Sequence, residues 1–248
     1  MSTQQRPVAI VNDASFYVGP PLARSLANSG HDLVLGDPAE GLVDELTQLG
    51  VRAIGVANVR DLTKAENAER LVKAAIDSFG RVDSAVMFSG RVITGSLLKS
   101  EAADLEKVYQ GCMVAPYNFL KAVLPAMVEQ KSGQVLIITS ATGARPTPNA
   151  PLYSAMRAGA NMLAMNAAAE MARHHVSVNA VGTNYMDFPE FLRASGAHDP
   201  ATREKIERQV PLGRLGTVEE FASFCMPFLD GKSTFATGQF ISFSGGWS

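Results

Sequence analysis

The sequence predicts an α/β protein with a doubly wound parallel sheet of seven strands and helices on both faces. Short apolar runs alternate with longer helical patterns along the whole chain, which is typical of β-α-β units. Hydrophobic residues occupy 46% of the 248 positions, enough to build a full core. No internal repeat, low-complexity tract or linker interrupts this order, so we expect a single domain over residues 1–248.

Seven short apolar runs are the expected strands, at residues 7–12, 32–36, 51–56, 84–88, 134–139, 176–181 and 239–243. Helical patterns lie between them, at residues 21–28, 71–79, 101–110, 114–130 and 152–173. Thr63 and Glu66 have the spacing of a capping box ahead of the second of these helices. The segment 183–211 is long and aromatic-rich, and we expect it to be a loop that forms a lid or a substrate wall.

Composition and charge argue against several classes of function. The formal net charge of -2 leaves no basic surface for nucleic acid or for a membrane. No run approaches the ~18 uninterrupted apolar residues of a membrane span, and the first expected strand begins too early to leave room for a signal peptide. The two cysteines and four histidines lack the spacing of a metal site. We therefore expect a cytoplasmic protein without a metal ion.

Three side chains near the fifth expected strand point to acid–base chemistry. Ser140 follows that strand, Tyr153 opens the next helix, and Arg157 lies one helical turn further on. A cation ~4 Å from a phenolate stabilises it by roughly 4 kcal/mol at an effective dielectric constant of about 20. We therefore predict that Tyr153 moves a proton, that Arg157 supports its phenolate and that Ser140 holds the substrate oxygen. The alternative is an aromatic residue that stands beside a surface arginine.

The first strand-to-helix turn, residues 11–19, lacks the glycines that let a backbone approach a pyrophosphate. Gly19 is the one that remains of three expected glycines, while Phe16 and Tyr17 add bulk. Asp37 follows the second expected strand, where an acidic residue suits a ribose, although an aspartate at a strand end needs no ligand to explain it. The turn therefore predicts a site without NAD(P).

Ser140, Tyr153 and the residues around them resemble the short-chain dehydrogenase/reductase superfamily, whose fold is Rossmann-like. The resemblance spans essentially the whole chain, including the late segments 211–216 and 237–247. Members that use NAD(P) carry a lysine where this chain has Arg157, and a planar guanidinium does not replace a compact ammonium. Three further departures from those members occur at positions that serve the cofactor or a proton relay, namely Asn58, Cys112 and the strand end 87–90.

The chain is also similar to halohydrin dehalogenases, relatives on the same fold that use Ser/Tyr/Arg and no nicotinamide. The aromatic residue two positions before Gly19 matches their early turn, whereas Asn12 departs from their threonine. The resemblance implies a halide site in the vacated nicotinamide space, and a loop of backbone N–H groups with aromatic edges suits a large anion. A plain packed turn is the alternative. The expected halide and substrate residues are Phe16, Tyr17, Thr183, Asn184, Tyr185 and Met186.

The expected function is the reversible conversion of a vicinal haloalcohol into an epoxide and halide, by a carbon–halogen lyase without a cofactor. In reverse, small anions such as azide, cyanide or nitrite would open the epoxide. Two alternatives stay open: an NAD(P)-dependent carbonyl or alcohol oxidoreductase, and a sensor or scaffold that is not an enzyme. The resemblance also implies a homotetramer that forms its contacts on the helices at 114–130 and 152–173.

Overall fold

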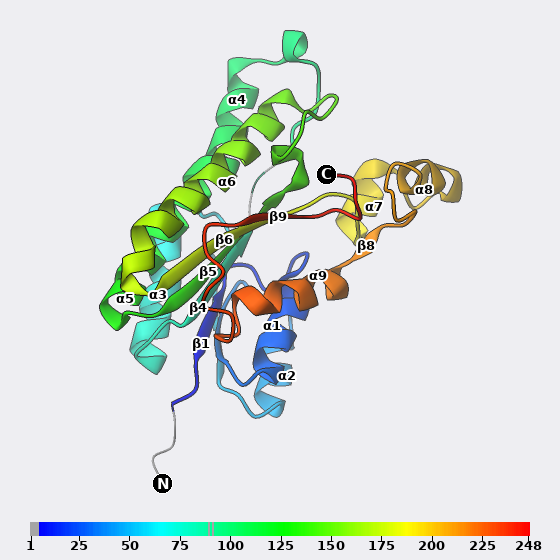
Figure 1. Cartoon of the computed structure of the whole chain (residues 1–248). Helices are drawn as coiled ribbons and strands as arrows, with labels where there is room; N and C mark the ends of the chain where they lie inside the picture. The colour runs from blue at the N-terminus through cyan, green and yellow to red at the C-terminus, as the bar shows by residue number, and fades with distance from the viewer. Residues whose placement is uncertain (1–4, 89, 91) are drawn as a thin grey trace.

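A parallel sheet lies at the centre of the computed structural model, which describes residues 5–88, 90 and 92–248 (Figure 1). The strand order is β3-β2-β1-β4-β5-β6-β9. These seven strands are β1 (Val8–Val11), β2 (Asp32–Gly36), β3 (Ala53–Val56), β4 (Ser84–Phe88), β5 (Gly133–Ser140), β6 (Val176–Thr183) and β9 (Phe240–Phe243). The predicted doubly wound α/β fold is confirmed.

Helices cover both faces of this sheet (Figure 1). One face carries α1 (Gly19–Asn28), α2 (Leu42–Gln48) and α9 (Val218–Cys225). The other carries α3 (Ala65–Phe79), α5 (Ala115–Gln130) and α6 (Pro151–Met171), with α4 (Ala102–Tyr109) packed on α6. Two apolar clusters result, one under each helical layer.

The side chains of β1 show why the strands read as unbroken apolar runs. Val8 and Ile10 belong to one apolar cluster, whereas Ala9 and Val11 belong to the other. Successive residues of a strand point to opposite faces, so a sheet covered on both faces needs apolar residues at every position.

The carboxyl end of the sheet is where side chains become available for chemistry. β1 pairs with β2 on one side and with β4 on the other, so the chain reverses its winding direction at β1. Ligands of doubly wound sheets bind in the crevice outside the strand ends at such a point. On the same edge, Ser140 at the end of β5 is aligned with Thr183 at the end of β6.

The segment 183–211 is more regular than expected, and the prediction of a loop is wrong. It contains β7 (Met186–Asp187), α7 (Pro189–Ser195) and α8 (Pro200–Glu207). β7 pairs with β8 (Gly216–Thr217), and Arg203 of α8 forms ion pairs with Asp187 at 2.6 Å and Glu207 at 2.8 Å. Helices of seven and eight residues are too short to show a clear apolar period, which explains the error.

The capping box expected at Thr63 and Glu66 is also absent. α3 begins after Lys64, and the Thr63 hydroxyl donates a hydrogen bond to Asp61 Oδ1 at 2.6 Å instead. The same spacing does form a capping box at Thr217 and Glu220, at the start of α9. The motif alone therefore does not say which side chain turns toward the helix.

Residues Ala102–Gln130 form one continuous helical run that is long and apolar enough to cross a membrane by length and composition. Buried side chains in its second half, including Phe119 and Val123, belong to the apolar cluster beneath α3 and α6. A core helix of an α/β protein passes the same test, and this packing accounts for the run.

Gly19 allows the first turn to close, because a Cβ at this position would lie 1.9 Å from the Asp13 carbonyl oxygen. A backbone atom cannot rotate away as a side chain can. We expect Gly19→Ala to lower the free energy of unfolding by about 3–5 kcal/mol, measured by urea denaturation. Gly159→Ala in α6 is the control, since its Cβ would first meet the flexible Met113 side chain. Equal losses in both variants would contradict this account of the turn.

Candidate active site

A cavity of about 720 Å³ opens at the carboxyl edge of the sheet, between the first turn and α7. Every residue that the sequence suggested for the site lines it, although these residues are far apart along the chain. They are Phe16, Tyr17, Ser140, Tyr153, Arg157, Thr183, Asn184, Tyr185 and Met186. The structure thus brings the predicted residues together, while their roles stay predictions.

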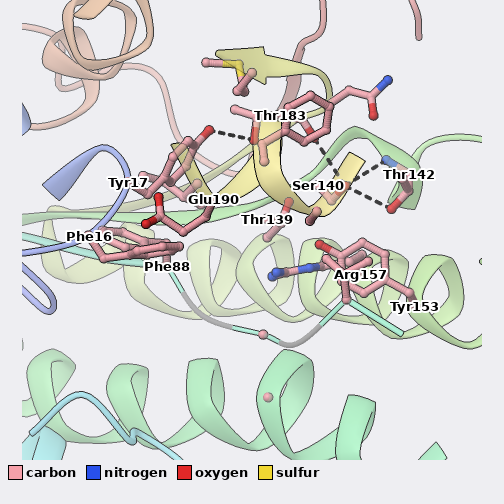
Figure 2. Close-up of a pocket in the computed structure, with 18 of the residues that line it drawn as sticks. Phe16, Tyr17, Phe88, Thr139, Ser140, Thr142, Tyr153, Arg157, Thr183 and Glu190 are labelled. Atoms are coloured by element: carbon pink, nitrogen blue, oxygen red, sulfur yellow. Dashed lines mark hydrogen bonds between the residues drawn. The ribbon is translucent and has the colours of Figure 1, made fainter. Parts of the chain in front are cut away.

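Ser140 is held by hydrogen bonds on three sides (Figure 2). Its hydroxyl donates to the Thr183 carbonyl oxygen at 3.2 Å and accepts from the Thr142 amide at 3.2 Å and the Thr142 hydroxyl at 3.0 Å. All three distances are at the long end for their type. The hydroxyl hydrogen can therefore turn from the Thr183 carbonyl oxygen to a substrate oxygen with little loss of hydrogen-bond energy.

Tyr153 and Arg157 lie together on the first turns of α6, which begins at Pro151 (Figure 2). Proline suits the first helical position because its missing N–H has no partner to lose there. The guanidinium carbon of Arg157 is 5.0 Å from the centre of the Tyr153 ring, and both residues are buried. The arginine is therefore not the surface residue of the alternative interpretation.

Arg157 keeps its charge in this buried position. Burial acts to lower the pKa of the guanidinium, but its interactions with the side chains around it, including a hydrogen bond with Tyr153, together outweigh burial and raise the pKa overall. Burial also raises the pKa of the Cys112 thiol, which keeps it neutral. Gly90 leaves the space that Arg157 needs, because a Cβ there would lie 2.6 Å from the guanidinium nitrogen Nη2.

Tyr17 occupies a backbone conformation that normally belongs to glycine. Its φ is 51°, in the left-handed region, which a bulky residue adopts only at an energetic cost of order 1–3 kcal/mol. Burial raises the pKa of its phenol, which stays protonated and donates a hydrogen bond to Thr183 Oγ1 at 3.0 Å. Tyr17 is thereby connected through Thr183 to Ser140 (Figure 2).

An aromatic wall surrounds the Tyr17 ring. Its centroid lies 4.7 Å from that of Phe188 and 6.0 Å from that of Phe88, and Phe16 makes an edge contact with Phe188 at 5.9 Å. Phe191 of α7 stacks on Phe188 at 6.3 Å and also lines the cavity. The side of the cavity between the first turn and α7 is therefore apolar.

Charged groups on the far side of the first turn are already paired. The Arg60 guanidinium contacts the Asp13 carboxylate at 2.7 Å. The Asp37 carboxylate accepts hydrogen bonds from the backbone amides of Asn58, Val59 and Arg60 at 2.6, 2.9 and 2.8 Å. A carboxylate offers about four acceptor positions, so these three bonds occupy most of them.

The Asn184 amide is a polar group in the cavity with unused hydrogen-bonding capacity. Within the described part of the chain, its Nδ2 is buried and has no hydrogen-bond partner. A buried donor left unsatisfied costs about 1–3 kcal/mol, which an acceptor on a ligand would recover. Among residues 5–88, 90 and 92–248, no three His, Cys, Asp or Glu side chains gather as they would around a metal ion.

Several residues of the site escaped sequence analysis. Thr142 holds Ser140, and Asn12 joins β1 to β4 by accepting from the Phe88 amide at 2.9 Å and donating to its carbonyl at 3.1 Å. Glu190 places a carboxylate beside Tyr17 (Figure 2) and forms an ion pair with Arg193 at 2.8 Å. The hydroxyl two residues after Ser140 was the available signal for Thr142, since such spacing favours local side-chain bonds.

Comparison with known proteins places the chain among reductases. A family model described as enoyl-(acyl carrier protein) reductase matches residues 18–248. A 3-oxoacyl-[acyl-carrier-protein] reductase of Synechocystis sp. is 32% identical, over 99% of this chain and 98% of that protein. The corresponding reductase of Staphylococcus epidermidis is 28% identical, over 96% of this chain and 97% of that protein.

Solved structures agree on the fold. Levodione reductase superposes with a TM-score of 0.87, at 24% identity over 98% of this chain and 97% of that one. Acetoin dehydrogenase from Enterobacter cloacae gives a TM-score of 0.85, at 24% identity over 99% and 96%. At this level of identity, the likeness shows the fold alone.

These comparisons correct the expected function. The interpretation as a halohydrin dehalogenase, a carbon–halogen lyase that works without a cofactor, is wrong because the matching family and the relatives are named as oxidoreductases. The physical reason for the error lies in what Ser140, Tyr153 and Arg157 do. The proton transfer at an oxygen atom that the sequence predicts for them would serve ring closure and carbonyl reduction equally.

The first turn lies where superfamily members that use NAD(P) hold the phosphates of the dinucleotide. Gly19 and the left-handed turn at residue 17 are retained. The Asp13 carboxylate, which pairs with the Arg60 guanidinium at 2.7 Å, and the Tyr17 ring, however, occupy space at the turn that glycines would leave open. With these side chains in place, the turn leaves less room for a dinucleotide than a glycine turn does.

We expect Thr142→Val to lower kcat about three- to tenfold with little change in KM, because the Ser140 oxygen loses the hydroxyl that polarises and orients it. Thr142→Ser restores the hydroxyl and is expected to restore kcat. In a Ser140→Ala background, Thr142→Val should have no further effect. An undiminished effect in that background would contradict the positioning role.

Proposed function

The chain belongs to the short-chain dehydrogenase/reductase superfamily, and from this premise we propose that it is an oxidoreductase that interconverts a carbonyl group and an alcohol on a small, largely apolar molecule. The observation that carries the proposal is the buried set of Ser140, Tyr153 and Arg157 at one wall of the main cavity. The names of the relatives support the redox class, since each is named as a reductase or a dehydrogenase.

A reduced nicotinamide dinucleotide, when bound, would supply a hydride to the carbonyl carbon, and its oxidised form would take the hydride back in the oxidising direction. In the reducing direction, the carbonyl oxygen accepts hydrogen bonds from the Ser140 hydroxyl and the Tyr153 phenol. As negative charge develops on that oxygen, the proton of the Tyr153 phenol passes to it and an alcohol forms. In the oxidising direction, the Tyr153 phenolate takes the proton back. General acid–base transfer of this kind is worth about 10²–10⁴ in rate.

Arg157 acts on the charge that this transfer leaves behind. The phenolate of Tyr153 forms next to a cation that cannot lose its proton. Because both groups are buried, their attraction is weakly screened by water and salt. The charge of Arg157 therefore favours the transfer, and its position under the ring keeps the phenol in place.

The remaining cavity residues define the substrate that we propose. The rings of Phe16, Tyr17 and Phe188 form an apolar part of the cavity wall and suit an apolar body on the substrate. The buried Asn184 amide suits a second acceptor on the substrate, such as an ether or carbonyl oxygen. Thr183, Tyr185 and Met186 complete this substrate wall.

We also propose a cytoplasmic homotetramer for the enzyme. Large apolar side chains are exposed on the outer surfaces of α5 and α6: Tyr117, Met162 and Met165 have exposed fractions of 51%, 55% and 37%. A contact between copies of the chain would cover them.

The direct test is reduction of small aliphatic and aromatic ketones with NADH or NADPH. We expect the wild type to form the alcohol and Tyr153→Phe to lose at least 10²-fold in kcat/KM. A variant with Asp13→Gly and Tyr17→Gly removes the two obstructing side chains and is expected to lower the KM for the dinucleotide by tenfold or more. Product is measured by gas chromatography as well as by nucleotide absorbance.

The opened variant distinguishes an obstructed carrier site from wrong chemistry. Turnover in the opened variant alone would mean that Asp13 and Tyr17 limit access of the carrier. Absence of alcohol from both the wild type and the opened variant, with both nucleotides and in both directions, would contradict the proposed function.

The proposed assembly is tested by light scattering coupled to size-exclusion chromatography. We expect Met162→Glu to shift the protein to a smaller species, because a charge buried in an apolar contact is strongly unfavourable. Leu49→Glu, at an exposed position after α2, is the matched control and should keep the wild-type mass. A monomeric wild type would contradict the assembly.

A further inference from the structure

A second cavity of about 230 Å³ lies beyond the main one, where the C-terminal segment after β9 passes the strand β8 (Figure 1). Tyr185 and Met186 line both cavities, so these two residues form the wall between them. We propose that the second cavity is a subsite for the apolar end of the substrate, with Met186 as a movable gate. This inference rests on the proposed function for the position of the reacting oxygen.

The composition of the second cavity selects an apolar occupant. Met186, Val210, Leu212 and Phe243 contribute hydrocarbon surface to it. Its charged groups are already paired, since Arg214 forms two hydrogen bonds to the Glu220 carboxylate at 2.6 and 2.8 Å. A charged ligand would have to compete with that pair, whereas an alkyl or aryl end needs no partner.

The Tyr185 hydroxyl is also satisfied, because it donates to Gln209 Oε1 at 2.9 Å. Its ring makes an edge contact with Trp247 at 6.1 Å and a tilted contact with Phe191 at 6.1 Å. The ring is thus fixed between α7 and the C-terminal segment. Tyr185 is therefore the rigid part of the wall.

Met186 is the part of the wall that can move. A methionine has three rotatable side-chain bonds and adapts to irregular spaces. Its sulfur faces Gly216 across the β7–β8 pair, and a Cβ at residue 216 would lie 3.0 Å from that sulfur. The missing side chain at Gly216 leaves the space that the Met186 sulfur occupies, and the second cavity lies next to it.

The distance from the reacting oxygen suits a chain of moderate length. The Thr183 carbonyl oxygen accepts the hydrogen bond from the Ser140 hydroxyl, and Met186 is three residues further along the chain. Three residues span at most about 11 Å. A substrate with its oxygen at Ser140 therefore reaches the gate without crossing the rest of the cavity.

Calorimetric binding of butan-2-one, hexan-2-one and octan-2-one, without any hydride donor, tests the subsite. We expect the wild-type Kd to fall about fourfold for each methylene group once the chain passes Met186. Val210→Phe and Leu212→Trp fill the second cavity, and each is expected to remove this dependence for the longer ketones. Leu98→Phe, at a position 97% exposed and outside both cavities, should keep the wild-type series.

A double substitution tests whether Met186 controls access to the second cavity. Met186→Ala is expected to tighten octan-2-one binding, and adding Val210→Phe should cancel that gain. If the dependence on chain length persists in both filling variants, or is absent from the wild type, the subsite is overturned whatever the turnover. If ketones bind with the expected dependence and no alcohol ever forms, the proposed function fails and the subsite stands.

Discussion

The site depends on one buried cation. Arg157 is 5% exposed, and a charge removed from water to that degree must be compensated by its surroundings. The Tyr153 ring supplies part of that compensation as a cation–π contact, and Gly90 supplies the space. The same arrangement places a fixed positive charge next to the Tyr153 ring. The contact that stabilises the buried arginine is therefore the same contact on which the proposed reactivity of the tyrosine depends.

The two ends of the site differ in how closely they follow the superfamily pattern. The wall around Ser140 and Tyr153 carries the proton transfer that we propose, and the reductase name of the Synechocystis relative agrees with that proposal. The first turn keeps the left-handed backbone of a glycine turn, but the residue there is Tyr17. Its backbone is strained, and its phenol donates a hydrogen bond to Thr183. Strain retained at a turn that faces a cavity indicates a function for the side chain. Tyr17 belongs to the substrate wall as much as to the fold.

Sequence alone predicted the fold well and the site in part. The central strands were recognisable because both faces of the sheet are covered, which leaves apolar runs with few interruptions. Ser140, Tyr153 and Arg157 were found because a strand end and one helical turn fix their relative positions. The helices α7 and α8 are too short to show an apolar period, so the sequence does not reveal them. The spacing of Thr63 and Glu66 likewise does not reveal that the Thr63 hydroxyl bonds to Asp61. The reaction itself was predicted wrongly, since the same three residues serve more than one reaction of an oxygen atom.

The most direct test of the central claim is a double-mutant cycle on ketone reduction with Tyr153→Phe, Arg157→Met and both together, each shown to be folded by circular dichroism. If Arg157 acts through the phenolate of Tyr153, the double variant should be no slower than Tyr153→Phe alone, because residues that act as a unit are not additive. Losses in kcat/KM that multiply in the double variant would show that Arg157 acts independently of Tyr153, and would contradict the account.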